Sequence, residues 1–414
     1  MQLKRIKKIF VLSTAAIIIL AGVYGTELKQ LYRVVNLFNE DVIVHNFSNM
    51  NEVMPTKLIK RSDPIRDFKG SPLDLPKSFT FRDHKIDLEL FLKETKSTAL
   101  VVIKDEAITF EEYYLGTKEN DLRVSWSMAK SYLSALFGIA VYEGHIPDLN
   151  VAVTEYVPKL KGSGYDGVTI KNVLQMSSGV AFNEDYHDFN SDINRFGRMM
   201  ALGGSFDEFA ASLVREREQG TYMHYVSIDT HVLGMVLRAA TGKTFEEYLT
   251  EKLWRKLGNE KDAHYLVDGL GEPMVLGGLS ATSRDYARLG LLFRDNGQLN
   301  GEQIIPEQWI KDSITPDASH LIPGKRDNAN SDFGYGYQWW IPEHSEQEFF
   351  AMGIYGQYIY INQKANVVIV KNSANTHFSD NDYESIHKTL AAFREIALSQ
   401  TVTSAQLSST ALGN

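Results

Sequence analysis

The stretch Ser127-Met128-Ala129-Lys130 sets a hydroxyl and an amine three residues apart. Residues at this spacing share one face of a helix, so the Lys130 amine can lie beside the Ser127 hydroxyl at the first turn. Small and apolar residues dominate the chain from there to Gly144. Because a helix that is apolar on most sides is buried, the sequence predicts a buried helix that begins with this polar pair.

The start of such a helix favours a reaction that creates negative charge. Its first amide groups have no partner within the helix, and the helix dipole adds partial positive charge there. An oxyanion formed by attack of Ser127 on a carbonyl would be stabilised, and a second donor is expected from a strand edge. Two further segments follow Ser127 along the chain, first Tyr225-Val226-Ser227 and then Met352-Gly353-Ile354-Tyr355-Gly356-Gln357. Together the three segments indicate a serine enzyme that transfers acyl groups.

The spacing of serine and lysine is a weak signal by itself. Ser385-Ile386-His387-Lys388 repeats it near the C-terminus, within a charged helical stretch from Asp382 to Arg394. No strand or tyrosine motif follows this second copy. We therefore interpret it as an ordinary solvated helix face.

The three segments resemble those of the serine β-lactamase and penicillin-recognising superfamily, in its class C branch of carboxylesterases and peptidases. Within that branch the chain is most similar to the 6-aminohexanoate-dimer hydrolases, whose Gly-x-x-Gly-Gln pattern is present at residues 353–357. The resemblance extends over about residues 45–398 and includes four more segments, Leu174–Gly179, Gly277–Thr282, Arg284–Arg288 and Tyr335–Trp340.

This resemblance implies roles for individual residues. The third motif of the family falls on Ala351-Met352-Gly353, and Ala351 carries no cation to hold a substrate carboxylate, which argues against penicillin hydrolysis. For Tyr186, in a loop like one that overhangs the acyl pocket, two interpretations stay open: a hydrogen bond to a substrate amide, or a surface aromatic. The implied catalytic residues are Ser127, Lys130 and Tyr225, and the implied oxyanion and substrate-binding residues are Gly353, Ile354 (through its N–H), Tyr186, Ser227 and Gln357.

Proximity and burial must activate the lysine and the tyrosine. Both side chains have an ordinary pKa of about 10, so neither is a base at neutral pH. Burial disfavours an ammonium, and a phenolate beside Lys130 is favoured by the opposite charge, so we expect Lys130 and Tyr225 to share a proton. Ser127 would attack, the pair would pass its proton to the leaving group, and water would hydrolyse the acyl-enzyme. Which of the two is the formal base stays open.

The predicted fold is α+β and β-lactamase/transpeptidase-like: an antiparallel sheet flanked by helices, with a mostly helical insertion. Alternating patterns predict two hairpins, 98–116 and 358–371, so both ends of the domain supply strands. We expect the Ser127 helix and the C-terminal helix to cover this sheet. The hydrolase domain is assigned to residues 78–398, and the small, polar residues 399–414 to a disordered tail.

The N-terminus predicts the location of the protein. Four cations, from Lys4 to Lys8, precede an apolar run from Ile9 to Gly25, so residues 1–26 are a signal sequence or a membrane anchor. A weak cleavage site favours retention as an anchor, with the catalytic domain on the periplasmic or extracellular face. Residues 27–77 are expected to form a juxtamembrane helix to Asp41 and then a proline-containing linker.

The amino-acid composition limits which functional classes this chain can belong to. The 414 residues are 43% hydrophobic, enough for a large core, and a net charge of −9 gives no reason to bind nucleic acid. There is no cysteine, and the 11 histidines form no HExxH pair, so we expect no thiol nucleophile, no metal and no cofactor. His224 and His231 are interpreted as structural or surface residues.

Three alternatives remain within this reading. The leading hypothesis is a serine hydrolase acting on a small amide or ester. The second is a catalytically silent binding module for a peptide or a cell-wall fragment. The third is a true β-lactamase or a D-amino-acid peptidase, because shared acyl chemistry does not determine the acyl group. The natural substrate and the oligomeric state are not determined by the sequence.

Overall fold

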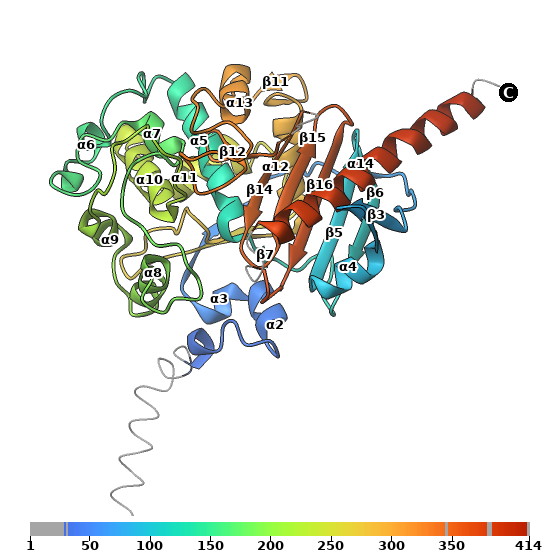
Figure 1. Ribbon diagram of the computed structural model, residues 1–414, viewed down its shortest axis with the longest axis horizontal. Helices are drawn as coiled ribbons and strands as arrows, with labels where there is room; N and C mark the ends of the chain where they lie inside the picture. Colours follow the sequence, from blue (N-terminus) through green and yellow to red (C-terminus); the bar gives the residue numbers. More distant parts are fainter. Residues whose placement is uncertain (1–28, 30–31, 344–346, 379–382, 412–414) are drawn as a thin grey trace, which may run out of the picture.

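The central feature of the computed structural model is a sheet of eight strands (Figure 1). The structure describes residues 29, 32–343, 347–378 and 383–411. Neighbouring strands are antiparallel, except that β2 runs parallel to β6. Both ends of the domain contribute, as predicted. The strand order is β12 (Gly334–Tyr335), β13 (Trp340–Ile341), β14 (Glu348–Gly353), β15 (Gln357–Asn362), β16 (Val367–Ser373), β5 (Ser97–Lys104), β6 (Ala107–Tyr113) and β2 (Lys69–Gly70).

The two predicted hairpins form the middle of this sheet. β5 pairs with β6 and β15 pairs with β16, both in antiparallel register. β16 then pairs with β5, with Val370 opposite Val101, and this joins the two chain ends. The central strands β5 and β16 are buried along almost their whole length, so the hairpins are present but the expected alternation of buried and exposed residues is not.

Helix α14 (Glu384–Ala411) crosses one face of the sheet, with α4 (Leu88–Glu94) beside it (Figure 1). Leu390 and Phe393 pack there in one buried cluster with Leu100 and Ile369. The helix continues beyond residue 398, so the tail expected to be disordered is helical as far as Ala411. Its inner face persists through Ile396 and Gln400, both buried, which extends the helix past the predicted end.

The opposite face is covered by α12 (Ser283–Arg294), not by the Ser127 helix, so this expectation was wrong. Gly290 explains the close packing of α12. A Cβ at Gly290 would lie 2.6 Å from Cγ1 of Val368 and 3.0 Å from Cγ2 of Ile359. The absence of a side chain therefore lets the helix settle directly on β15 and β16.

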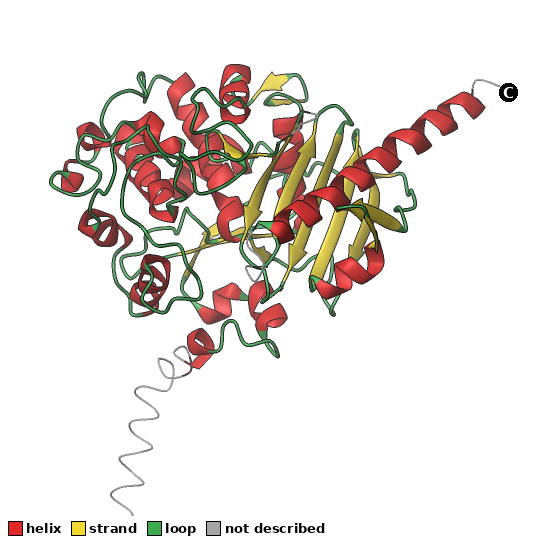
Figure 2. Cartoon of the chain, in the orientation of Figure 1, coloured by secondary structure: helices red, strands yellow, loops and turns green. Residues whose placement is uncertain are grey.

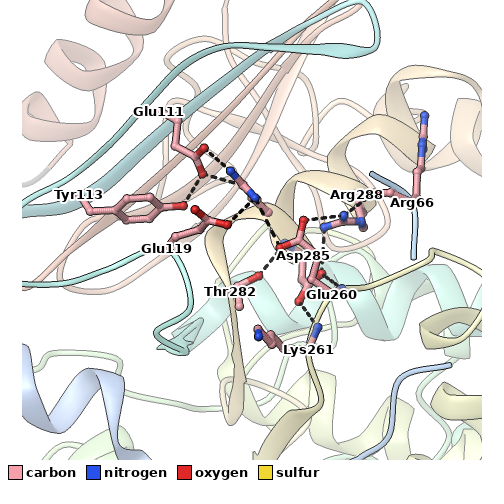
Figure 3. Close-up of polar contacts among 10 residues, drawn as sticks. Arg66, Glu111, Tyr113, Glu119, Glu260, Lys261, Thr282, Asp285 and Arg288 are labelled. Atoms are coloured by element: carbon pink, nitrogen blue, oxygen red, sulfur yellow. Dashed lines mark hydrogen bonds and ion pairs between the residues drawn. The ribbon is translucent and has the colours of Figure 1, made fainter. Parts of the chain in front are cut away.

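Charged side chains attach α12 to the sheet and to the loop around residue 260 (Figure 3). Arg284 donates to both carboxylate oxygens of Glu111, at 2.7 and 2.5 Å, and to Glu119 at 2.6 Å. Arg288 donates to Asp285 at 3.0 Å and to Glu260 at 2.9 Å. We call these residues the α12 charge network.

The Ser127 helix belongs instead to a helical region beside the sheet (Figure 2). It comprises the 3₁₀ turn η1 (Trp126–Met128) followed by α5 (Ala129–Tyr142), whose residues 129–140 are all buried, as predicted. It packs against α10 (Ser227–Thr241). The other short helices are α6 (Val153–Tyr156), η2 (Pro158–Leu160), α7 (Ile170–Leu174), α8 (Asp192–Ala201), α9 (Phe206–Ser212), α11 (Phe245–Leu249), η3 (Thr250–Trp254) and α13 (Glu307–Ile314).

Much of the expected linker is part of the fold. After a helical stretch at 32–35 the chain turns, so the juxtamembrane helix does not continue to Asp41. It then forms α2 (Ile43–Ser48), α3 (Met50–Val53) and β1 (Thr56–Ile59). The apolar residues of these elements join the core, because Ile43, Phe47, Met50 and Val53 are all buried. The prolines of this segment had suggested a linker, but Pro55 simply precedes a strand.

Three small sheets complete the structure. β1 joins a sheet with β8 (Ala263–Leu266), β9 (Leu279–Ala281) and β7 (Arg123–Val124), in that order. The other two are pairs, β3 (Ser78–Phe81) with β4 (His84–Asp87) and β10 (Gln298–Leu299) with β11 (Glu302–Gln303). The proposed anchor, residues 1–26, lies outside the described residues. Among the residues that are described, no helix has the length and apolar character needed to cross a membrane.

Candidate active site

Ser127 lies in a strained turn that aromatic side chains hold in place. Trp126, the residue before it, has a φ of +42°, and Tyr355 in the facing turn has a φ of +63°. Bulky residues rarely adopt this left-handed region, and such strain gathers at functional sites. The Phe47 ring lies 5.6 Å from that of Trp126 and 5.2 Å from that of Tyr355. The segment around α2 therefore supports the turn that carries Ser127.

The Lys130 amine is beside the Ser127 hydroxyl, as predicted. Its Nζ donates to Ser127 Oγ at 2.9 Å, to the Leu276 carbonyl at 2.9 Å and to Ser227 Oγ at 3.3 Å. Burial lowers the pKa of Lys130 to about 7, and the negative charges of Glu184 and Asp229 only partly oppose this shift. The amine can therefore release and accept a proton near neutral pH.

Tyr225, the third predicted catalytic residue, lies beside Lys130. Its ring centre lies 5.1 Å from Lys130 Nζ, and its ring stacks on Trp340 at 5.2 Å. Burial, followed by the charge of Glu184, raises the pKa of Tyr225, although hydrogen bonds with Ser127 and Ser227 partly oppose the shift. Burial and the charge of Glu184 therefore outweigh the stabilisation that a Tyr225 phenolate was expected to gain from Lys130. Tyr225 therefore stays protonated near neutral pH.

Glu184 is a functional candidate that sequence reasoning missed. One oxygen, Oε1, accepts from Ser227 Oγ at 2.6 Å and from the Tyr186 hydroxyl at 2.8 Å. The other, Oε2, accepts from the Ser227 N–H at 3.2 Å, at the start of α10. A carboxylate is favourable at a helix N-terminus. Glu184 thus holds Ser227 and Tyr186 in position, and only its closeness to Tyr186 in sequence could have pointed to it.

The edge of β14 lies directly against the Ser127 turn. A Cβ at Gly353 would lie 2.4 Å from the Ser125 carbonyl oxygen and 2.9 Å from the Ser127 nitrogen, so glycine is required there. This places Gly353 and the following Ile354 beside the nucleophile, and both line the same pocket as Ser127. The oxyanion role of the Ile354 N–H stays a prediction.

Gln357 does not face this pocket. Its side chain is buried and donates to the Ser373 carbonyl at 2.6 Å, while its oxygen accepts from the Asn372 amide at 3.1 Å. The expectation that Gln357 binds substrate was therefore wrong: it ties β15 to the end of β16. In the second serine-lysine pair, Ser385 lines the pocket, but Lys388 lies over the ring of Phe91, 5.5 Å from its centre.

The two histidines named from the sequence have partners within the fold. His224 Nε2 lies 2.8 Å from the Phe182 carbonyl oxygen, and His231 Nε2 lies 2.7 Å from Asp207. Among the described residues, no group of three or more histidine or acidic side chains is arranged to hold a metal ion.

The pocket in front of Ser127 has a volume of about 520 Å³. Tyr186 lines it, with its ring 5.8 Å from that of Phe378. Tyr225, Trp340 and Met352 line one part, and the start of α14 lines another. A volume of this size suits a small molecule. Lys371, which sequence reasoning also missed, is a further lining residue.

Comparisons with known proteins place this geometry in context. The beta-lactamase family profile matches residues 91–392. The chain is 30% identical to a 6-aminohexanoate-dimer hydrolase of Paenarthrobacter ureafaciens over 79% of this chain and 84% of the relative. The structure of a proposed 6-aminohexanoate-dimer hydrolase from Bacillus anthracis superposes with a TM-score of 0.79 at 25% identity, covering 87% of this chain and 95% of that one. A class C beta-lactamase variant shares the fold, with a TM-score of 0.54 at 17% identity and coverage of 75% and 94%.

Proposed function

Because the chain belongs to the beta-lactamase family, whose profile spans residues 91–392, we propose that it is a serine hydrolase that cleaves an amide or ester bond. The acyl-enzyme forms on Ser127. The observation that carries this proposal is the 2.9 Å hydrogen bond between Lys130 Nζ and Ser127 Oγ in a buried setting. An amine whose pKa is about 7 is suited to activate a hydroxyl at neutral pH.

In the first half of the reaction, Ser127 Oγ forms a bond to the substrate carbonyl carbon and its proton moves to Lys130 Nζ. The oxyanion is stabilised by the N–H groups of Ser127 and Ile354. When the tetrahedral intermediate collapses, the bond to the leaving group breaks, and Tyr225 gives the leaving group a proton that it regains from Lys130. Tyr225 suits this role because its raised pKa keeps it protonated.

In the second half, a water molecule attacks the acyl-enzyme. Lys130 accepts a proton from this water and returns one to Ser127 Oγ as the acyl group leaves. Glu184 keeps Ser227 and Tyr186 in place throughout, because it accepts hydrogen bonds from both. Tyr186 lines the pocket and is proposed to contact the substrate amide.

An amide or ester is favoured over a β-lactam as the substrate. The relative with 30% identity is named for hydrolysis of 6-aminohexanoate dimer. The third motif of this chain carries Ala351 in place of a cation. A catalytically silent binding module remains the competing interpretation, and covalent labelling separates the two.

The test is intact-mass measurement after treatment of the full chain, kept in detergent, with a fluorophosphonate. Ser127→Ala is compared with Ser385→Ala, the matched change in the second serine-lysine pair. We expect one adduct on the unaltered chain and on Ser385→Ala, and none on Ser127→Ala. A folded, unaltered chain that forms no adduct would contradict the hydrolase and favour the binding module.

We also propose that residues 1–26 anchor the enzyme on the outer side of the cytoplasmic membrane. The support is the cationic flank and the apolar run of the sequence. Fractionation of cells should find the full chain with membranes, and protease added outside should reach the catalytic domain. A protein recovered in solution with its N-terminus after residue 25 would contradict retention of the anchor.

A further inference from the structure

Lys371 is a buried cation in the same pocket as Ser127. It lies on β16 opposite Tyr358 of β15 and Leu100 of β5, and only 1% of its surface is exposed. Lysine is almost never buried to this extent without a partner of opposite charge. Its position in a cavity wall therefore calls for an explanation beyond packing.

The polar partner that Lys371 has is a hydroxyl. Its Nζ donates to Ser373 Oγ, and among the described residues no carboxylate lies within ion-pair distance of it. Burial lowers its pKa to about 7, and no acidic side chain among the described residues opposes the shift. A bound anion would supply the missing charge and would hold the lysine in its protonated form.

The glycine turn between β14 and β15 leaves this amine open to the pocket. A Cβ at Gly356 would lie 3.6 Å from Lys371 Nζ and 3.1 Å from Cβ of Ser373. Gly356, with a φ of +86°, and Gly353 bound the same turn. Gly353 leaves room for Ser127, and Gly356 places no side-chain atoms beside Lys371.

The sheet sets the direction from Ser127 to Lys371. Tyr225 stacks on Trp340 of β13, on one side of β14, whereas Lys371 is on β16, on the other side. Both are on the α14 face, where Tyr225, Met352 and Tyr358 share one cluster. Adjacent strands are about 4.8 Å apart, so β14 and β16 are separated by about 10 Å. The leaving group departs toward Tyr225, and the acyl part of the substrate therefore extends toward Lys371.

We propose that Lys371 binds a carboxylate at the far end of the acyl group, so that the substrate is a half-amide or half-ester of a dicarboxylic acid. This inference rests on the proposed hydrolase function for the direction of the acyl group. It also accounts for the missing cation at Ala351, because a strand two positions away in the sheet supplies the charge instead.

The experiment compares two p-nitrophenyl esters of adipic acid, one with a free carboxylate and one with that carboxylate capped as a methyl ester. Each is tested with the unaltered chain, with Lys371→Met, and with Lys388→Met, which removes the same charge from a residue that does not line the pocket. A charge-assisted hydrogen bond contributes about 1.5–3 kcal/mol, which is about a 10- to 100-fold change in affinity. We therefore expect Lys371→Met to raise KM for the free half-ester by about that factor.

The capped ester and the Lys388→Met variant are expected to show no change of this kind. Turnover of the capped ester by Lys371→Met also shows that the variant is folded. Equal loss on both esters, or no loss on either, would overturn the carboxylate site while leaving the hydrolase function intact.

If the unaltered chain turns over neither ester, fluorophosphonate labelling of Ser127 decides the hydrolase proposal, and binding measurements decide the anion site. Calorimetry then measures the binding of adipate to the Ser127→Ala chain and to the Ser127→Ala/Lys371→Met chain. Binding that depends on Lys371 supports the site. Absence of binding, or equal binding to both chains, overturns it.

Discussion

Two regions of this molecule bury positively charged side chains, and burial there has opposite outcomes for the pKa values of those side chains. In the α12 charge network, Arg284 forms ion pairs with three carboxylates and Arg288 with two. In the pocket, Lys130 and Lys371 are buried, and in the described part of the chain neither has a carboxylate within ion-pair distance. Burial would lower the pKa of Arg284, but hydrogen bonds and the charge of Glu111 outweigh it and raise that pKa. Burial lowers the pKa of both lysines to about 7.

The comparison separates charges that hold the fold from charges that remain reactive. A paired cation keeps its proton at all ordinary pH values and contributes to the structure. An unpaired buried amine exchanges its proton near neutral pH, at a cost in stability.

The largest effect is expected from Lys130→Met, which removes the reactive amine. Loss of a general base lowers the rate by about 10³-fold, so kcat and the rate of fluorophosphonate labelling should both fall by about that factor. Thermal unfolding should show no loss of stability, because a buried unpaired charge has been removed. Lys388→Met is the matched control. Labelling of Lys130→Met at the rate of the unaltered chain would rule out Lys130 as the base.

Arg288→Met should show the opposite behaviour. Arg288 and Asp285 are both fully buried, so removal of the cation leaves an uncompensated buried carboxylate. Breaking such a pair costs about 3–5 kcal/mol of unfolding free energy, which urea denaturation would measure. The fraction that stays folded at low temperature should label at Ser127 as fast as the unaltered chain. A stable but inactive variant would contradict the division between the two regions.

Tyr225→Phe is expected to have an intermediate effect. It removes the proton donor to the leaving group and keeps the ring that stacks on Trp340. We expect kcat to fall about 100-fold, and less for a p-nitrophenyl ester than for an amide, because nitrophenolate leaves without a proton. Equal, near-full turnover of both substrates would refute the assignment.

The smallest effect concerns pH. The rate at limiting substrate should rise tenfold per pH unit below about pH 7 and level off above it, as Lys130 loses its proton.

The free energy of unfolding should also depend on the protonation of Lys130. The pKa of Lys130 is about 7 in the folded chain against 10.5 when unperturbed, so the unfolded chain binds more protons between these values. Unfolding free energy therefore rises with pH in that window, and Lys130→Met should reduce the slope. A rate that is flat from pH 5 to 8 would contradict this.

The fold was largely predictable because its signals are local. The alternation around β5 and β6 and the apolar run after Ser127 predicted a hairpin and a buried helix, and both are present. The errors came from contacts between distant segments. The closeness of α12 to the sheet depends on Gly290 facing Val368, and the linker containing Phe47 became core because it packs on Trp126.

The sequence by itself determined the order of the motifs and the pairing of Ser127 with Lys130, because residues three apart on a helix share a face whatever surrounds them. Only the tertiary structure decided which charges are compensated. It brought Glu184 to Ser227 across 43 positions and left Lys371 with no carboxylate partner among the residues that the structure describes. The pKa values follow from burial and neighbouring charge, so they arise only when the chain has folded.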